Sequence, residues 1–513
     1  MTPTTRSFWR QTSISAVLIL VWLAATAWLR PLALPDEGRY VGVAWEMMRS
    51  GDWLTPTLNS LPYFHKPPLF YWITAASMSL FGLNEWAARA APLLGAWMGA
   101  LALYLFVRRW WGERAGRMTL LALLVQPLFY LGAQFANLDM LVGGCITATI
   151  VLLAHAVLSI EQQLPYRRTL MAAYAMAALG VLSKGLIGAV LPALVILAWL
   201  AMLRRWRVIF LLLSFSGIAA FFLIAAPWFI AMQWRFDNFL DYFFVVQQFN
   251  RFAVGGFNNV QPLWFYPAVL ILFSLPWLPW LYRPLTRDYL ADARRSPIRL
   301  LMWLWVLVLV LFFSIPGSKL LGYILPAVPP LACLMADGML SLGAASIRLK
   351  RLWWLSAALS TALCIGAVLW YSVYPPGSLR NLATLLATQR QPNEPVFMLH
   401  RYYYDIPLYA KLTQPVGVVD DWTSPDIFRV DNGRKELADT GLFASDRSTL
   451  TLLVPTAFTT AVCRSPVSWV IGGKAMRNRY PFLQKARVVL TQNDDTVLWR
   501  VDHPVCVLGK PAN

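Results

Sequence analysis

Residues 14–29 read ISAVLILVWLAATAWL, and PDEGRY follows closely at residues 35–40. A run of about 16 mainly apolar residues, rising ~1.5 Å each, covers most of a hydrocarbon core about 30 Å thick. The run therefore predicts a membrane-spanning helix and places Asp36 and Glu37 just beyond its C-terminal end, at the membrane–water boundary. Ionisable groups at that depth are costly to bury and commonly mark a function. On these residues alone, an ordinary polar end to the span explains them equally well.

The composition is that of a polytopic α-helical membrane protein. Of 513 residues, 58% are hydrophobic and 13% are charged, whereas soluble domains are usually about 45–50% apolar and about 25% charged. Apolar segments recur as far as residue 374. We expect about eleven spans, at 14–29, 88–107, 117–135, 140–158, 169–183, 185–203, 208–231, 263–281, 300–315, 320–341 and 352–373.

The net charge of +19 does not indicate a nucleic-acid partner. The basic residues fall in short segments between apolar spans, and these segments alternate with basic-poor ones, as positive-inside topology requires. The basic segments, such as 108–117 and 283–299, are therefore expected in the cytoplasm. The opposite set is external and contains 30–87, Asp139, Lys184, 232–262 and 316–319. We expect a multi-pass protein of the bacterial cytoplasmic (inner) membrane, with these loops in the periplasm.

The region after residue 374 has a different residue composition and pattern. It mixes charge, proline and short β-like runs at 395–399, 449–454, 467–471, 487–490 and 496–501, with short helices expected at 406–412 and 431–440. We therefore divide the chain into a transmembrane domain, 1–374, and a small periplasmic α/β domain, 375–513. Cys463 and Cys506 both lie in the second domain, and an oxidising compartment would allow them to pair.

Polar groups gather in the external segments, although distant parts of the chain supply them. Long loops that carry polar groups on a rigid scaffold are where function usually resides. The set comprises Asp36, Glu37, Arg39, Glu46, Asp52, His65, Lys66, Asn137, Asp139, Lys184, Gln247, Gln248, Asn250, Arg251, Ser318, Lys319 and Tyr323.

The stretch YFHKPPLFYW, residues 63–72, combines a basic residue with a predicted helix start. Pro67 and Pro68 would begin a helix cleanly, and Lys66 would then sit beside its N-terminus, where an anion such as phosphate is favoured. The apolar run that follows suits a helix in the membrane interface better than a full span. An amphipathic anchor with a snorkelling Lys66 is the alternative reading of this stretch.

These blocks resemble the lipid A aminoarabinose transferases, which belong with the protein O-mannosyltransferases among the GT-C glycosyltransferases. The likeness is carried by DEGRY (36–40), GDWLTPTLNSLPYFHKPPLFYW (51–72), GLNEWAARAAPLLGA (82–96), ANLDM (136–140), LSKGLIG (182–188), QFNRF (248–252) and PGSKLLGYILPAVPPLA (316–332). It covers about 330 residues in matching order, while residues 375–513 match only in position and type.

The resemblance implies an enzyme whose sugar donor is linked to polyprenyl (undecaprenyl) phosphate and whose acceptor is lipid A or another surface glycan. Asp36 would be the catalytic base, with Glu37 beside it and Asp139 as a second acid. The donor phosphate would be held by Lys66, Arg251 and Tyr323, with Lys184 and Lys319 at basic family positions of less certain role.

Two departures from the family pattern lie beside the expected donor phosphate. The family typically has Glu where this chain has His65, and His where this chain has Gln248. Those family residues can bind a divalent metal, but His65 with Gln248 is a poorer pair for zinc. No cofactor is therefore firmly expected, and His65 is the candidate metal ligand.

The chemistry that these residues predict is an inverting transfer. One base deprotonates the acceptor hydroxyl while cations stabilise the leaving phosphate. A protein O-glycosyltransferase of the same fold is the alternative within this class. A transporter would instead place its ionisable groups near the bilayer midplane in related halves, and a non-catalytic sensor would tolerate substitution of both Asp36 and Lys66.

Overall fold

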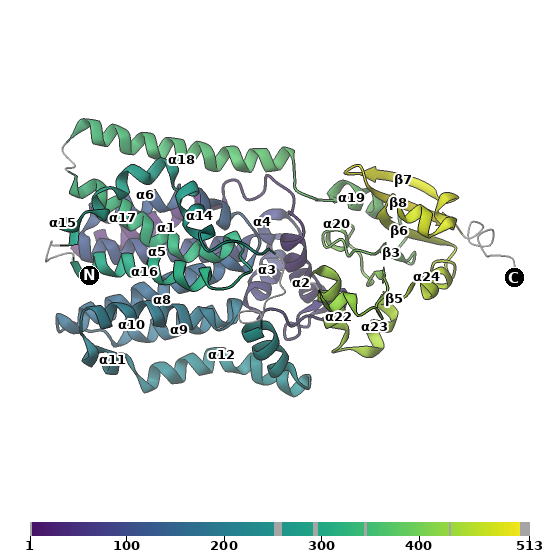
Figure 1. Cartoon of the computed structure of the whole chain (residues 1–513), viewed down its shortest axis with the longest axis horizontal. Coiled ribbons are helices and arrows are strands. Elements are labelled where there is room, and N and C mark those ends of the chain that lie inside the picture. Colours follow the sequence, from purple (N-terminus) through teal and green to yellow (C-terminus); the bar gives the residue numbers. More distant parts are fainter. Residues whose placement is uncertain (1–2, 251–258, 291–295, 343–345, 430–431, 503–513) are drawn as a thin grey trace. The chain divides into compact units, whose positions relative to one another are not determined.

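The computed structural model describes residues 3–250, 259–290, 296–342, 346–429 and 432–502, and it forms two compact units (Figure 1). The helical unit takes residues 3–30, 65–250, 259–290, 296–342 and 346–373. The α/β unit takes residues 31–64, 374–429 and 432–502. Residues 31–64 thus group with the C-terminal region, although the sequence suggests a loop of the transmembrane domain.

Each of the eleven expected spans overlaps a helical segment of the helical unit, although the ends differ by several residues, as at 14–29 against α1, which ends at Ala24. Continuous helices are interrupted where proline or a turn breaks the backbone hydrogen bonds. The segments are α1 (Pro3–Ala24), α5 (Ala90–Trp111), α6 (Glu113–Leu124) with α7 (Pro127–Ala133), α8 (Leu138–Glu161), α9 (Arg167–Lys184), α10 (Ile187–Met202), α12 (Phe215–Arg235), α14 (Phe265–Phe273) with η2 (Leu275–Leu281), α16 (Ser296–Ser314), η4 (Leu321–Ala327) with α17 (Val328–Ser341), and α18 (Ile347–Val373).

Within the described ranges, six helices are long and apolar enough to cross a membrane. A seventh crossing results if α6 and α7, which meet at a 67° bend, form one span. Shorter apolar helices cover Trp9–Ala24, Leu69–Phe81 and Ile187–Met202. The expected span at 263–281 is broken because Pro276 and Pro279 fall in the 3₁₀ helix η2.

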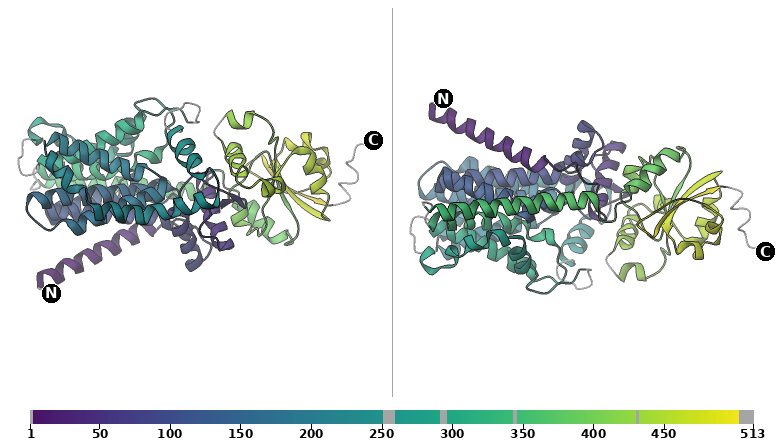
Figure 2. Two further views of the ribbon diagram at one scale, coloured as in Figure 1. Left: turned by 90° about the horizontal axis from the view of Figure 1, so that it is seen from below. Right: turned by 90° about the horizontal axis from the view of Figure 1, so that it is seen from above.

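Burial differs strongly among the spanning helices. In the most apolar stretch of α8, 83% of the residues are buried, against 28% in α12 and 33% in α18. Figures 1 and 2 show α18 as a long helix along the outside of the helical unit. Its outward residues include Leu355, Leu359 and Leu363, which suit contact with lipid.

Close packing of α5 against α8 depends on glycine. A Cβ atom added at Gly144 would overlap the backbone of Gly95, so the two helices approach backbone to backbone. Small residues spaced like Gly95 and Gly99 commonly make such contacts between membrane helices, where van der Waals packing drives association.

The remaining elements of the helical unit are short. Helix α3 begins at Leu69, directly after Pro67 and Pro68, which confirms the expected helix start. The short elements of the helical unit are α3 (Leu69–Phe81), α4 (Glu85–Ala88), α11 (Trp206–Leu212), the π-helix η1 (Asp241–Asn250), η3 (Arg283–Leu285) and α15 (Arg287–Leu290).

The α/β unit is built on a six-stranded sheet with the order β5-β4-β3-β6-β8-β7. Strands β5, β4, β3 and β6 run parallel, whereas β8 is antiparallel to both β6 and β7. The strands are β3 (Val396–Leu399), β4 (Gly417–Val419), β5 (Leu452–Leu453), β6 (Val467–Gly473), β7 (Arg487–Gln492) and β8 (Thr496–Asp502). The helices are α19 (Arg380–Gln389), α20 (Ile406–Tyr409), α21 (Asp426–Arg429), α22 (Gly433–Gly441), α23 (Ser445–Thr451), α24 (Pro455–Val462), α25 (Met476–Arg479) and η5 (Pro481–Gln484).

The structure confirms the α/β class that the sequence predicts for this region, although it has more helices than expected and its strands differ from the expected ones in two places. Strand β4 was not expected, because its three residues are too few to show an alternating pattern. The expected strand at 449–454 is reduced to Leu452–Leu453, because residues 445–451 form helix α23. Cys463 is disulfide-bonded, and Cys506 lies outside the described residues.

Residues 31–64 join this unit through hydrogen bonds that link distant parts of the chain. They form α2 (Asp36–Ser50) and a hairpin of β1 (Thr57–Leu58) and β2 (Leu61–Pro62). The Leu32 backbone N–H donates to the Tyr409 hydroxyl over 2.9 Å. The Asn59 side chain donates to the Val416 carbonyl over 2.9 Å and accepts from the Val416 N–H over 2.8 Å.

Candidate functional site

The candidate residues form polar clusters in each unit. In the helical unit, Asp139 lies in the first turn of α8, where the N-terminal end of the helix dipole favours a carboxylate. The cap residue Asn137 fixes it: the Asn137 side-chain oxygen accepts from the Asp139 N–H over 2.5 Å, and the Asn137 amide donates to Asp139 Oδ2 over 3.1 Å. Asp139 is only 5% exposed, so it needs a charged partner.

Lys184 provides that partner. It is the last residue of α9, where the C-terminal end of the dipole favours a cation, and its ammonium forms an ion pair with Asp139. The same Lys184 Nζ lies 4.2 Å from the centroid of the Tyr323 ring in η4, within the range of a cation–π contact. Three segments expected on the external side therefore meet in this acid–base–phenol cluster.

Lys319 makes contacts of a different kind. Its Nζ donates to the backbone carbonyls of Pro316 (2.6 Å) and Gln261 (2.8 Å), and its backbone N–H donates to the Asn259 carbonyl over 3.1 Å. Its side chain is nearly buried, with the residue 3% exposed. In this arrangement Lys319 joins the segments 259–261 and 316–319.

His65 lies in a hydrogen-bonded group that the sequence only partly predicts. The Tyr242 hydroxyl lies 3.3 Å from His65 Nε2, and Gln247 Nε2 donates to that hydroxyl over 3.0 Å. Tyr242 was not expected, because its position in a mainly apolar π-helix carries no local signal. Lys66 Nζ donates to the His65 carbonyl over 3.0 Å. Across the described ranges, no three His, Cys, Asp or Glu side chains group as metal ligands. Arg251 lies outside the described residues.

Asp36 and Arg39 lie on one face of the first turns of α2 in the α/β unit. Arg39 Nη2 donates to Asp36 Oδ1 over 2.5 Å, and the Asp36 side chain is 30% exposed. The neighbouring Glu37 is fully buried, and its Oε2 accepts from the Ala33 backbone N–H over 2.8 Å. Asp36 is partly buried but more exposed than Glu37, and it is therefore the better placed of the two to meet a substrate.

The opposite side of the Arg39 guanidinium binds Glu436 on α22. Arg39 Nη1 donates to both carboxylate oxygens of Glu436, over 3.0 and 2.9 Å. The hydroxyls of Tyr63 and Tyr404 also donate to Glu436, over 2.6 and 2.9 Å. Burial alone would lower the pKa of Arg39, but the Glu436 carboxylate beside it holds that pKa above its usual range. Glu436 was not predicted as a site residue, because it lies in the region without detailed family likeness.

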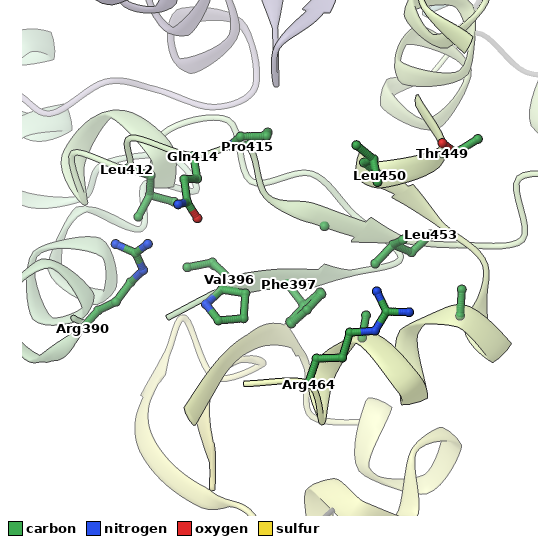
Figure 3. Close-up of a pocket in the computed structure, with 14 residues that line it drawn as sticks. Arg390, Val396, Phe397, Leu412, Gln414, Pro415, Thr449, Leu450, Leu453 and Arg464 are labelled. Atoms are coloured by element: carbon green, nitrogen blue, oxygen red, sulfur yellow. The ribbon is translucent and has the colours of Figure 1, made fainter. Parts of the chain in front are cut away.

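A cavity of about 350 Å³ also lies in the α/β unit, where strands β3 and β4 begin (Figure 3). Arg390 and Arg464 lie on opposite sides of it, with Val396 and Phe397 between them (Figure 3). The described residues that line it include no carboxylate or imidazole. The cavity therefore offers positive charge and apolar surface but no general base.

A second ion-paired cluster follows the carboxyl ends of β3 and β4. His400 Nδ1 lies 3.0 Å from Asp420 Oδ1, and Arg434, also on α22, donates to the same carboxylate. Burial alone would raise the pKa of the Asp420 carboxyl, but the contacts with His400 and Arg434 outweigh burial, so this pKa lies below its usual value. Helix α22 is thus held by two separate ion pairs, one through Arg434 and one through Glu436.

Comparison with known proteins supplies the family. Residues 65–230 match the family model described as dolichyl-phosphate-mannose-protein mannosyltransferase. An undecaprenyl phosphate-α-4-amino-4-deoxy-L-arabinose arabinosyl transferase of Pseudomonas fluorescens is 32% identical over 332 residues, which are 63% of this chain and 59% of the relative. The transferase of that name from Pectobacterium carotovorum is 32% identical over 381 residues, covering 71% of this chain and 67% of the relative. The chain belongs to this arabinosyl transferase family.

A solved structure confirms the fold of this family member. The structure of ArnT from Cupriavidus metallidurans bound to undecaprenyl phosphate superposes with a TM-score of 0.80, at 23% identity, over 96% of this chain and 98% of that one. The resemblance and the polytopic fold with a C-terminal α/β region, both expected from the sequence, are therefore confirmed. The chain spans less than three fifths of the length of several curated relatives of this name: 59% of the one from Pseudomonas fluorescens and 57% of two others.

Proposed function

We propose that this chain is an integral-membrane glycosyltransferase that moves a sugar from an undecaprenyl phosphate donor to lipid A or another cell-surface glycan. The relatives are named as undecaprenyl phosphate-α-4-amino-4-deoxy-L-arabinose arabinosyl transferases, which supports the donor class and makes 4-amino-4-deoxy-L-arabinose the sugar to test first. The proposed location is the bacterial inner membrane, with the helical unit as the transmembrane domain and residues 375–513, together with residues 31–64 of the same α/β unit, on the periplasmic side.

The observation that carries this proposal is the buried ion pair of Asp139 and Lys184 beneath the Tyr323 ring. A charged pair within a membrane-spanning unit is costly, and such pairs mark substrate sites by default. A sugar phosphodiester brings a negative charge that grows on the phosphate as the glycosidic bond breaks. Lys184 and the Tyr323 hydroxyl suit stabilisation of that charge, and Asp139 orients Lys184.

The remaining roles follow from chemistry and exposure. We assign Asp36 as the base that removes a proton from the acceptor, because it is the more exposed of the two adjacent acids. Direct displacement with a single base inverts the anomeric carbon. Glu37 supports the start of α2, Lys66 and Arg251 add cations for the donor phosphate, and Lys319 shapes the loops beside Tyr323. The mechanism requires no metal-bound step, and His65 is assigned to the hydrogen-bonded group with Tyr242.

Replacement of Asp36 by Asn tests the proposal. The purified full-length chain in lipid nanodiscs is supplied with undecaprenyl phosphate-linked 4-amino-4-deoxy-L-arabinose and lipid A, and mass spectrometry follows the product. General-base catalysis contributes roughly 10²–10⁴-fold, so Asp36→Asn should lose activity by about that factor. Asp52→Asn is the control, because Asp52 caps the Leu54 and Thr55 N–H groups within the same segment. Wild-type turnover by Asp36→Asn would remove Asp36 from the base role.

The same preparation separates the rival functions. A protein O-glycosyltransferase would label a protein acceptor and leave lipid A unmodified. A transporter would move the donor across sealed vesicles without cleaving it, and its activity would survive Asp36→Asn.

A further inference from the structure

We propose that Glu436 of α22 is a positioning residue for transfer, and that it acts on Asp36 through Arg39. The inference rests on the proposed function, because it takes Asp36 as the base. It gives the region after residue 374 an indirect part in catalysis, because Glu436 would orient the base through Arg39.

The geometry of the guanidinium carries the inference. One Arg39 nitrogen, Nη1, is bound by both Glu436 oxygens, while the other, Nη2, reaches Asp36 over 2.5 Å. Side-chain exposure rises along the chain of contacts, from 8% at Glu436 through 19% at Arg39 to 30% at Asp36. The buried end is therefore the fixed end, and Asp36 is the end that a substrate can reach.

Glu436 is built to stay in place as an anion. Its oxygens accept from Arg39 and from the hydroxyls of Tyr63 and Tyr404, so the desolvated carboxylate is fully hydrogen-bonded. The rings of Tyr40 and Tyr404 lie 4.7 and 6.0 Å from the Arg39 guanidinium carbon. These rings confine Arg39 from the sides, so that its direction toward Asp36 is set by Glu436.

The charge balance explains why a second carboxylate is useful. A lone arginine on Asp36 would stabilise the ionised acid and make it a weaker base. Glu436 shares the positive charge of Arg39 and adds a like charge to the network, and both effects favour proton uptake by Asp36. Loss of Glu436 should therefore move the acidic limb of the pH–rate profile to lower pH. Among the described residues, the hydrogen bonds of this network join the charged and titratable groups Asp36, Glu37, Arg39, Tyr40, Tyr63, Tyr404 and Glu436.

A matched pair of substitutions on α22 tests the proposal. Glu436→Gln removes the charge that orients Arg39, whereas Arg434→Gln breaks the other ion pair of the same helix, to Asp420. We expect Glu436→Gln to lower kcat by at least about tenfold, a part of the contribution of a general base. The KM for the donor should stay unchanged, and the acidic limb should shift to lower pH. Arg434→Gln should leave all three quantities as in the wild type.

A conservative variant keeps the test decisive where Glu436→Gln does not fold. Glu436→Asp keeps the charge but is one methylene shorter, so it should lower kcat while leaving the acidic limb in place. Equal kcat losses in Glu436→Gln and Arg434→Gln, an unmoved acidic limb in Glu436→Gln, or wild-type kcat in Glu436→Asp would overturn the positioning role.

The failure of this inference is distinguishable from failure of the proposed function. If Asp36→Asn is inactive and Glu436→Gln behaves as the wild type, only the role of Glu436 is lost. If Asp36→Asn remains active, the base assignment itself fails, whatever Glu436→Gln does.

Discussion

The carboxylate of Asp139 occupies the space that a Cβ atom on residue 322 would fill, so Gly322 makes room for the acid. Gly322 directly precedes Tyr323, whose ring covers the ammonium that pairs with Asp139. The missing side chain therefore lets η4 close over the ion pair. The sequence gives no indication of this role, since a glycine beside an aromatic residue has many explanations.

We predict that Gly322→Ala pushes Asp139 away from Lys184 and lowers the transfer rate. A displacement of about 1 Å in an aligned site can cost on the order of 100-fold in rate. Initial rates with lipid A as acceptor would measure the effect. Gly317→Ala in the neighbouring segment is the matched control, because nothing lies within 4 Å of a Cβ atom there. Equal rates for the two variants would show that the contact with Asp139 has no catalytic consequence.

We predict that the pair formed by Asp139 and Lys184 is stabilising only while both charges are present. Asp139→Asn or Lys184→Gln alone leaves one buried charge without its partner, which costs about 3 kcal/mol or more of unfolding free energy. The double variant should regain most of this stability, because neither charge remains. Melting temperatures in detergent would measure stability, and all three variants should stay defective in transfer.

Transfer activity of the double variant distinguishes a structural role of the Asp139–Lys184 pair from a catalytic one. If the double variant regains both stability and wild-type turnover, the ion pair is only structural. If it is as unstable as the two single variants, uncompensated charge does not explain their loss.

We predict that Asp405 makes the α/β unit less stable as the pH rises. Burial raises the pKa of Asp405 to about 6, although hydrogen bonds from Leu379 and Ser378 partly oppose the shift. Because the pKa of Asp405 is higher in the folded than in the unfolded state, its protonation stabilises the folded α/β unit. This contribution is complete below pH about 4 and is lost as the pH rises through about 6. The loss is on the order of 3 kcal/mol.

Hydrogen exchange of the backbone in α20, measured between pH 4 and 7 and corrected for intrinsic rates, would follow this change. Asp405→Asn is the control, because it cannot ionise and its opening free energy should stay nearly flat with pH. A wild-type profile as flat as that of the Asn variant would contradict the raised pKa.

Local sequence was sufficient for the features that depend on neighbouring residues. Pro67 and Pro68 predicted a helix start, and α3 begins at Leu69, because proline needs no N–H partner in a first helical turn. The strands of the α/β unit were placed to within a few residues wherever they exceed three residues. β4 was missed because Gly417–Val419 is too short to show a period.

Features that depend on distant residues were found only in the tertiary structure. Tyr242 was missed as a partner of His65 because 177 residues separate the two in the sequence. Glu436 was missed as a partner of Arg39 across 397 residues. No local pattern marks such pairs, since a single Glu on a polar helix face is usually a solvated residue.

Consecutive residues and local motifs are enough to predict that the chain spans a membrane, where its apolar segments lie and which family its external segments resemble. The tertiary structure decided that residues 31–64 belong to the α/β unit and that Arg39 binds two carboxylates at once. It also decided that Gly322 leaves space for Asp139. These are contacts between segments far apart in the chain, and their geometry is set by packing and desolvation that no stretch of residues encodes alone.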